Sequence, residues 1–238
     1  MRIEDIAVPM PAATSTDGVF AALYNAIITM DLPPGTKLSE VEVARQFDLS
    51  RQPVRDAFFR LSQLDFLSVR PQRATRVTPI SEQAVIDATF VRLALEAECL
   101  RLVCDRATPA DIAMLDDNLA RQAEFAATDA ISQFHALDEQ FHEALCRIAG
   151  HEHVWGVIRT QKAHTDRVRW LSLSQARRTE VLADHRAIRD AVAAGDLAAA
   201  DARLRNHLEH ILGILPGIRE AHRDCFAEDA LAGRAQAD

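Results

Sequence analysis

The sequence has few residues of the kinds that interrupt helices, and it has no segment built to cross a membrane. Its 238 residues include 8 glycines, 9 prolines and one tyrosine. No apolar run approaches the roughly 18 residues that a membrane span needs. The N-terminus, MRIEDIAVPM, lacks the basic start and the long apolar stretch of a signal peptide. The sequence therefore predicts a soluble, cytoplasmic protein with no membrane partner.

Cysteines are also scarce, and the four present form no CxxC pair. Cys99 and Cys104 are five residues apart, which is about 140° round a helix, so their side chains would point apart. In a cytosolic chain we expect all four to be small apolar core residues, namely Cys99, Cys104, Cys146 and Cys225.

The chain has an excess of acidic residues, but its positive charge is concentrated in one short segment. The net charge is −8, which argues weakly against nucleic acid as a partner, and 48% of residues are hydrophobic, which excludes wholesale disorder. Residues 45–76 nevertheless hold seven arginines against three aspartates. Arginine binds phosphates and guanine edges through two parallel hydrogen bonds. The alternative is a solvated helix face, so the surrounding pattern has to decide.

The distribution of proline indicates a small punctuated domain followed by a long helical one. Six prolines lie before residue 75, whereas none occurs between Pro109 and Pro216. A chain of this length suits one large or two ordinary domains. We predict a mainly α protein with these parts: an N-terminal tail, 1–18; a DNA-binding domain, 19–80; an all-α domain, 81–228; and a C-terminal tail, 229–238.

The first domain has the pattern of a winged helix-turn-helix. Apolar residues from Val19 to Met30 recur at helical spacing and are followed by a Pro-Pro-Gly turn. A short helix begins after Ser39, and a third helix begins after Ser50 with Pro53 in its first turn, where a missing N–H costs nothing. The segments FLSVR and TRVTPI then read as a two-stranded hairpin.

The arginines occupy the positions of this fold that meet DNA. The start of the third helix would enter the major groove, and the hairpin, as the wing, would reach the DNA backbone. We therefore predict base and phosphate contacts for Arg51, Gln52 and Arg55, and wing contacts for Arg73 and Arg76. Arg45 and Ser50 are expected to hold phosphates.

The segment PPGTKLSEVEVARQFDLSRQPVRDAFFRLSQLDFLSVRPQRATRV resembles the DNA-binding domain of the GntR family of bacterial repressors. The resemblance covers roughly residues 19–79, and its most specific part is the run S-R-x-P-V-R at Ser50–Arg55. Two positions depart from the family pattern: Phe66 stands where a glycine is usual after the third helix, and Ala74 stands where a glycine is usual at the wing tip. Both departures concern the geometry of the wing rather than the third helix.

From Ser81 onward the pattern predicts one amphipathic helix after another, without a repeat period that would indicate a solenoid. An all-α bundle is therefore expected. The predicted helices lie near residues 82–105, 108–126, 129–149, 152–172, 175–194, 196–214 and 216–228.

Four ionisable residues lie in apolar stretches of these helices. Asp138 and His142 are one turn apart on one helical face, while His185 and His207 each lie mid-helix between aliphatic neighbours. A carboxylate and imidazoles on adjacent turns and helices can bind one divalent cation, and bundle interiors are natural hosts for such sites. Each histidine alone could equally be a core residue with satisfied hydrogen bonds.

The order and spacing of these residues resemble the FCD ligand-binding domain of the FadR subfamily of GntR regulators, over about residues 82–212. The resemblance implies that Asp138, His142, His185 and His207 bind a divalent metal, zinc or nickel, beside a cavity for a small organic acid. It also places the family arginine at Arg92, which would meet the carboxylate of the effector. Arg169 is a further candidate for lining the cavity.

The resulting hypothesis is a ligand-responsive transcriptional regulator with no catalytic residues. It would be a homodimeric repressor that binds a double-stranded DNA operator and is released by a small carboxylic acid, such as a sugar acid or a hydroxy acid. Two alternatives stay open: a metal-dependent enzyme that acts on a small organic acid, and a DNA-binding module whose helical bundle serves only for dimerisation.

Overall fold

The computed structural model describes residues 16–69 and 74–228. Within it the chain forms two compact units. The unit that contains the N-terminal domain also includes Asp166–Trp170 and the described residues from Leu215 onward. The other unit consists of Val85–Thr165 and Leu171–Ile214.

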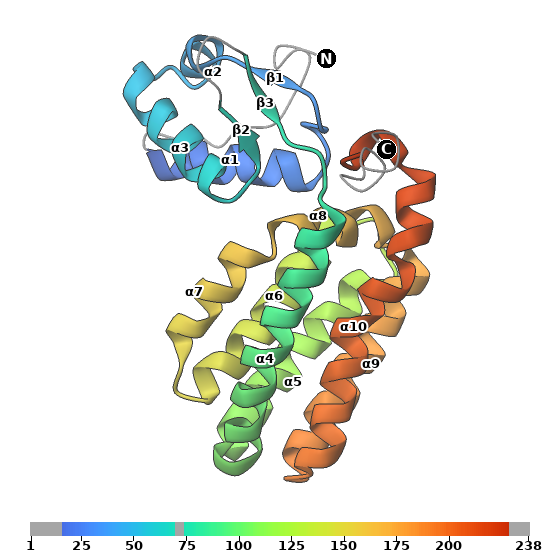
Figure 1. The fold of residues 1–238 in the computed structure, drawn as a ribbon. Helices are drawn as coiled ribbons and strands as arrows, with labels where there is room; N and C mark the ends of the chain where they lie inside the picture. Colours follow the sequence, from blue (N-terminus) through green and yellow to red (C-terminus); the bar gives the residue numbers. More distant parts are fainter. Residues whose placement is uncertain (1–15, 70–73, 229–238) are drawn as a thin grey trace. The chain divides into compact units, whose positions relative to one another are not determined.

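The N-terminal domain is a winged helix-turn-helix, as the sequence predicts (Figure 1). α1 begins within the segment predicted to be a tail and packs against α3. Three short antiparallel strands form one sheet in the order β1-β3-β2, with Leu67 opposite Val77. The elements are α1 (Thr16–Ile28), β1 (Lys37–Leu38), α2 (Glu40–Gln46), α3 (Arg51–Gln63), β2 (Leu67–Ser68) and β3 (Thr75–Val77).

Local sequence signals account for the helices of this domain. The Ser39 side chain accepts a hydrogen bond from the backbone N–H of Glu42 and so caps α2. Ser50 is the N-cap residue of α3 in an extended conformation, although its side chain makes no capping bond. The apolar stripe of α3 is buried against the rest of the domain: Val54, Ala57, Phe58 and Leu61.

The sheet has a third strand that the sequence analysis missed, because it read the segment before α2 only as a turn. Gly35, at φ +81°, donates its N–H to the carbonyl of Val77, and the N–H of Val77 donates to the carbonyl of Thr36. The chain thus passes directly from the Pro-Pro-Gly turn into pairing with β3. This pairing is specified by a partner about forty residues further along the chain, so local periodicity does not reveal it.

The structure also accommodates Phe66 where the family pattern has glycine. The left-handed conformation after α3 is adopted by Asp65, at φ +55°. Aspartate tolerates this conformation better than most side chains do. Phe66 is then fully buried, with its ring edge-on to Tyr24 at 5.1 Å between centroids. The turn therefore does not depend on a glycine at residue 66.

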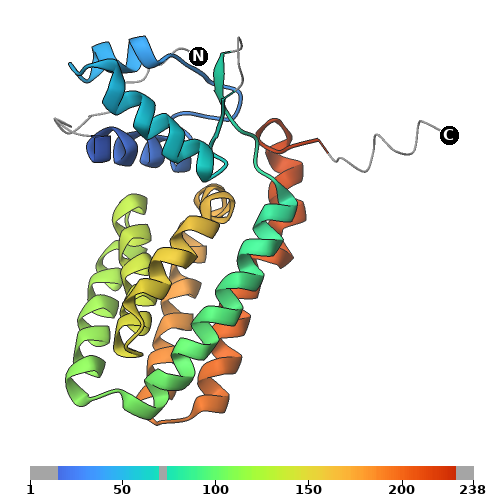
Figure 2. The same ribbon diagram turned by 60° about the vertical axis from the view of Figure 1, so that its left-hand side comes forward.

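The C-terminal part of the chain is an all-α bundle, in which α4, α5, α6, α9 and α10 run side by side in both views (Figures 1 and 2). Its core cluster joins apolar residues from these helices and from α7. The helices are α4 (Glu82–Arg106), α5 (Pro109–Ala126), α6 (Ile131–Ile148), α7 (Glu152–Gln161), α8 (Ala163–Ser172), α9 (Gln175–Ala193) and α10 (Leu197–Ala221).

Two of the predicted helix boundaries are wrong. The segment predicted as one helix over 152–172 is broken at Lys162, a buried residue whose Nζ lies 2.6 Å from Oε2 of Glu139. Conversely, α10 continues through Pro216 to Ala221, where two helices were predicted. A one-residue break leaves the apolar period almost unchanged, and packing can outweigh the cost of a proline inside a helix.

One buried arginine hydrogen-bonds to the backbone at the end of α5 and before the start of α9. Arg178 on α9 is only 3% exposed, and its guanidinium donates to three backbone carbonyls. The acceptors are Ala126 at 3.2 Å, Thr128 at 2.6 Å and Leu173 at 2.8 Å. Ala126 is the last residue of α5, Thr128 follows α5, and Leu173 precedes α9. Arg178 therefore donates to backbone carbonyls that have no partner within a helix.

We expect Arg178→Met to lower the free energy of unfolding by roughly 2 to 4 kcal/mol, because it leaves buried carbonyls without donors. Urea denaturation of the metal-free protein measures this change. Arg186→Met on the exposed side of the same helix is the matched control and should leave the midpoint unchanged. Equal effects of the two substitutions would contradict the role assigned to Arg178.

Candidate DNA-binding surface and metal centre

The start of α3 presents the polar side chains that the sequence assigned to DNA contact. Arg51, Gln52 and Arg55 are all exposed. Nη2 of Arg51 and of Arg55 lie 3.3 Å and 3.4 Å from the same carboxylate oxygen of Glu40, on α2. Gln52 donates to Asp56 over 2.9 Å. The two arginines thus share one acidic partner at the exposed start of α3.

Three of the other predicted contact residues are exposed, and the fourth is not among the described residues. Arg45 and Ser50 are exposed, and Arg76 on β3 is exposed and donates to the carbonyl of Gly35 over 2.8 Å. Arg73 lies outside the described residues. Arg60, to which no DNA contact was assigned, is held by α1 through an ion pair of 2.6 Å with Asp17.

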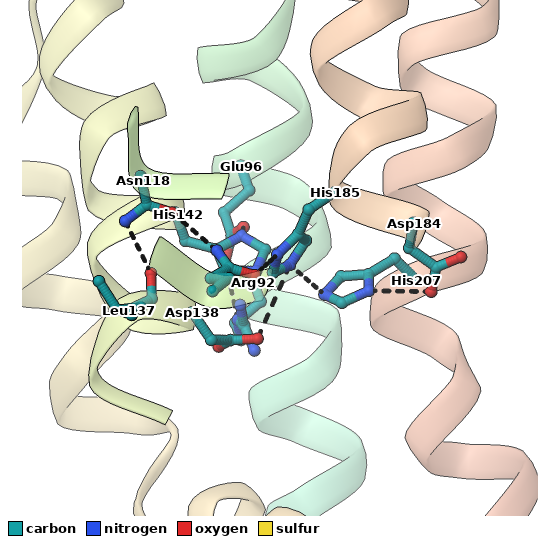
Figure 3. A network of polar contacts seen from close by, with 10 residues as sticks. Arg92, Glu96, Asn118, Leu137, Asp138, His142, Asp184, His185 and His207 are labelled. Atoms are coloured by element: carbon teal, nitrogen blue, oxygen red, sulfur yellow. Dashed lines mark hydrogen bonds and ion pairs between the residues drawn. The ribbon is translucent and has the colours of Figure 1, made fainter. Parts of the chain in front are cut away.

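In the bundle the structure brings the four candidate ligands together from three helices (Figure 3). Asp138 and His142 come from α6, His185 from α9 and His207 from α10, and all four are buried. Their candidate ligand atoms all lie within 4.8 Å of one another. Nε2 of His185 lies 3.3 Å from Nε2 of His207 and 3.7 Å from a carboxylate oxygen of Asp138.

Each histidine of the cluster turns its Nδ1 outward to a different partner. His142 faces a carboxylate oxygen of Glu96 at 2.7 Å, on α4. His185 faces the side-chain oxygen of Gln122 at 2.9 Å. His207 faces Asp184 at 3.2 Å. This is the usual arrangement for metal-ligating histidines, because an outward Nδ1–H leaves the Nε2 lone pair for the ion.

Sequence reasoning assigned no role to any of these three outer partners, Glu96, Gln122 and Asp184. Asp184 directly precedes His185, and Gln122 lies one turn after Asn118 on a face of α5 that is otherwise apolar. A pair of amide residues on the buried face of a helix was the signal available for Gln122.

Glu96 lies in an ion-pair network closed off from water. It is 1% exposed and accepts a hydrogen bond of 2.7 Å from Nε of Arg92, which is 3% exposed. Burial by itself would raise the pKa of the Glu96 carboxyl, but the charge of Arg92 and the neighbouring His142 ring, together with hydrogen bonds from both side chains, lower that pKa to about 2. Glu96 is therefore a carboxylate that orients both His142 and Arg92.

The residues of the cluster fit a divalent metal ion. Among the described residues no hydrogen-bond partner reaches the buried Nε2 of His142, which faces the other ligands. A buried polar atom of this kind is costly without a partner, and an ion would supply one. Three imidazole nitrogens and one carboxylate oxygen are a donor set that suits zinc or nickel and disfavours calcium or magnesium.

The two predicted effector residues differ in their surroundings. Arg92 lies beside the cluster and is oriented by Glu96 (Figure 3). Arg169 is half-buried on α8 and belongs to the compact unit of the N-terminal domain.

None of the described helices combines the length and the hydropathy that a membrane-spanning helix requires.

Comparison with known families identifies both parts of the chain. The bacterial regulatory proteins of the gntR family match residues 15–77, and the FCD domain matches residues 87–210. The chain therefore belongs to the GntR family of bacterial regulators and carries a C-terminal FCD domain. The prediction of a GntR-type DNA-binding domain and an FCD-like bundle is confirmed.

Relatives and solved structures agree with this assignment. The chain is 35% identical to an HTH-type transcriptional regulator of Streptomyces ambofaciens over 91% of this chain and 92% of that protein. It is 32% identical to the HTH-type transcriptional repressor RspR of Escherichia coli over 92% of this chain and 96% of RspR. A transcriptional regulator GntR from Rhodococcus sp. RHA1 has a similar structure, with a TM-score of 0.69, 25% identity, and coverage of 83% of this chain and 97% of that chain. These proteins are regulators, so the chain is a bacterial transcriptional regulator and not an enzyme.

Proposed function

We propose that this regulator is a repressor that leaves its operator when a small carboxylic acid binds beside a metal ion in the FCD domain. The observation that carries the proposal is the buried cluster of Asp138, His142, His185 and His207. A cluster of this composition has no evident use in a bundle that serves only for dimerisation. RspR, a relative over nearly its whole length, is named a repressor.

In this proposal two positive groups, the metal ion and the Arg92 guanidinium, together bind the acid. Asp138, His142, His185 and His207 would hold the metal ion, which would offer the acid a further coordination position. Arg92 adjoins the cluster, and Glu96 orients its guanidinium through Nε. A guanidinium can bind a carboxylate through two parallel hydrogen bonds, so Arg92 is the second positive group. Sugar acids and hydroxy acids satisfy this arrangement, since each has a carboxylate and a neighbouring oxygen.

The N-terminal domain would bind double-stranded DNA through the start of α3. Arg51, Gln52 and Arg55 would reach base edges and phosphates in the major groove, while Arg45, Ser50, Arg73 and Arg76 would hold the backbone. Two copies in a homodimer would read the two halves of a palindromic operator. Chromosomal DNA in bacteria lies in the cytoplasm, which supports the predicted location.

The acid can act as a signal only if it binds one arrangement of the dimer more tightly than the other, because equal affinity for both would shift nothing. We propose that the DNA-bound arrangement is the weaker binder. Binding of the acid and binding of the operator would then oppose each other with one shared coupling free energy.

Metal analysis of the purified protein tests the first half of the proposal. We expect about one zinc or nickel ion per chain, and loss of the ion in Asp138→Ala and in His185→Ala. His153→Ala, in which an exposed histidine of α7 is removed, is the matched control and should keep the ion. Absence of metal from the native protein after zinc and nickel have been offered would refute the site.

Release of DNA tests the second half. A panel of sugar acids, hydroxy acids and dicarboxylates is added to the complex of the metal-loaded protein with DNA that the protein itself selects from the genome. We expect one chemical class to release the DNA, and Asp138→Ala to abolish that response while DNA binding persists. If Asp138→Ala and His185→Ala leave folding and release unchanged, the bundle is a dimerisation device.

A further inference from the structure

Helix α5 contributes no ligand to the cluster, yet two of its polar side chains are buried beside it. Asn118 is 8% exposed and Gln122 is fully buried, and the two lie one turn apart on the same face of the helix. Buried amides are costly unless all their polar atoms are used. Their hydrogen bonds form a continuous chain that ends on His185.

This chain has three bonds. The side-chain NH2 of Asn118 donates to the backbone carbonyl of Leu137 over 3.1 Å. The side-chain oxygen of Asn118 accepts from the NH2 of Gln122 over 2.7 Å. The side-chain oxygen of Gln122 lies 2.9 Å from Nδ1 of His185. Figure 3 shows its first bond, from Asn118 to Leu137.

The direction of every bond follows from the first one. A backbone carbonyl can only accept, so Asn118 must turn its NH2 toward Leu137 and its oxygen toward Gln122. Gln122 must then donate to that oxygen, which leaves its own oxygen for His185. Only a protonated Nδ1 can bond to this oxygen, so the neutral His185 ring carries its proton on Nδ1 and its lone pair on Nε2.

We propose that Asn118 and Gln122 are positioning residues that set the tautomer of His185 and so direct the Nε2 lone pair into the cluster. As far as the metal ion is concerned, this inference rests on the proposed function. The tautomer itself does not, because the hydrogen bonds that set it join residues of the chain only. We call the series Leu137–Asn118–Gln122–His185 the amide relay.

The other two histidines show why His185 needs a relay. The outer partners of His142 and His207 are the carboxylates of Glu96 and Asp184, which can only accept and therefore hold the proton on Nδ1 by themselves. An amide has a donor at one end and an acceptor at the other, so Gln122 alone would stabilise either tautomer. Asn118, anchored on a carbonyl, removes that ambiguity.

The anchor of the relay lies next to another ligand. Leu137 directly precedes Asp138, so the relay joins the backbone at the carboxylate ligand on α6 to the imidazole ligand on α9. Phe141 stacks on the His185 ring with 4.3 Å between centroids and restrains the ring plane. The relay fixes the protonation pattern of the ring, and the stacking fixes its orientation.

Nitrogen NMR of the metal-free, full-length protein labelled at histidine tests the relay, because the two tautomers give distinct shifts for the two ring nitrogens. The spectrum of His185→Gln identifies the His185 signals. We expect the Nδ1–H form in the wild type. In Asn118→Leu we expect a shift toward the Nε2–H form, since Gln122 is then free to turn its NH2 toward His185.

Zinc affinity, measured by competition with a chelator, provides the second readout. Loss of an outer-shell partner typically costs about 10- to 100-fold in metal affinity. We expect a weakening of zinc affinity in this range for Asn118→Leu. The hydrogen bonds of the Asn118 side chain go to Leu137 and Gln122, and neither of these residues is a candidate metal ligand. Unchanged zinc affinity in a variant whose tautomer has shifted would overturn the role of the relay in metal binding.

A double variant separates the relay from a merely structural role. In Asn118→Leu combined with Gln122→Glu, residue 122 has only oxygens and can only accept from His185. We expect this double variant to recover the Nδ1–H form and most of the zinc affinity that Asn118→Leu loses. Leu115→Ala, a purely apolar change in the buried face of α5, is the packing control and should leave the tautomer unchanged.

The possible outcomes are distinct. An unchanged tautomer in Asn118→Leu, or the same shift in Leu115→Ala, overturns the relay. If the wild type binds no zinc but the tautomer responds as expected, the metal function fails and the relay stands. If zinc binds and the relay variants behave like the wild type in both readouts, the metal function stands and the relay fails.

Discussion

Replacing Arg51 and Arg55 together by alanine is expected to weaken binding of selected operator DNA by about 30-fold to 25,000-fold, because each paired contact of an arginine with a base contributes about 1 to 3 kcal/mol. Both side chains are exposed at the start of α3 and their only described partner is Glu40, so the fold should not suffer. Gel-shift titration at one fixed salt concentration measures the effect, and the melting temperature checks the fold.

Two neighbouring substitutions make the DNA prediction specific. Arg60→Ala removes the same charge from the same helix, but Arg60 is paired with Asp17, so we expect little change in affinity. Glu40→Gln removes the acidic partner of Arg51 and Arg55, so we expect tighter binding, especially to non-specific DNA. A loss in Arg60→Ala as large as that in the double variant would mean that overall charge, rather than the start of α3, governs binding.

Glu96→Leu is expected to lower the free energy of unfolding of the metal-free protein by roughly 3 to 5 kcal/mol, which is the usual cost of removing one partner from a buried ion pair. The substitution leaves the guanidinium of Arg92 buried without its carboxylate and removes the partner of His142. Chemical denaturation monitored by circular dichroism measures the change.

The partner and the matched control sharpen this prediction. In Arg92→Met combined with Glu96→Leu the buried guanidinium is removed together with its carboxylate partner, so much of the lost stability should return. Glu98→Leu, in which the removed carboxylate is exposed and paired with Arg101 on the surface, should leave the midpoint unchanged. A double variant no more stable than Glu96→Leu would show that the main function of Glu96 is to hold His142.

The features that local pattern determines were predictable from the sequence. Capping by Ser39, the buried stripe of α3 and the positions of most bundle helices follow from residues within a few positions of one another. The cluster residues were identified because Asp138 and His142 share a helical face and because the order of all four resembles the FCD domain. Their convergence, by contrast, depends on how three separate helices pack.

The features that the sequence did not reveal are those made by distant partners. β1 depends on pairing with β3, and the break at Lys162 accompanies an ion pair between this buried lysine and the half-buried Glu139. Gln122 reaches His185 across 63 residues of chain, so no periodicity within α5 indicates its role. The local sequence shows only that Gln122 is a polar residue on an otherwise apolar helix face, and it does not identify His185 as the partner.

The pairing of Ile80 with the end of the described chain has a consequence for preparing the DNA-binding domain as a fragment. The N–H of Ile80 donates to the carbonyl of Cys225, and its carbonyl accepts from the N–H of Ala227, so a segment more than 140 residues away completes the backbone bonding at this point. Ile80 itself is fully buried. A recombinant fragment that stops at residue 80 would end in an exposed isoleucine whose backbone N–H and carbonyl have lost these partners. A fragment of the DNA-binding domain should therefore be designed to keep a partner for Ile80, and the end of the first domain in the sequence is not a sufficient guide.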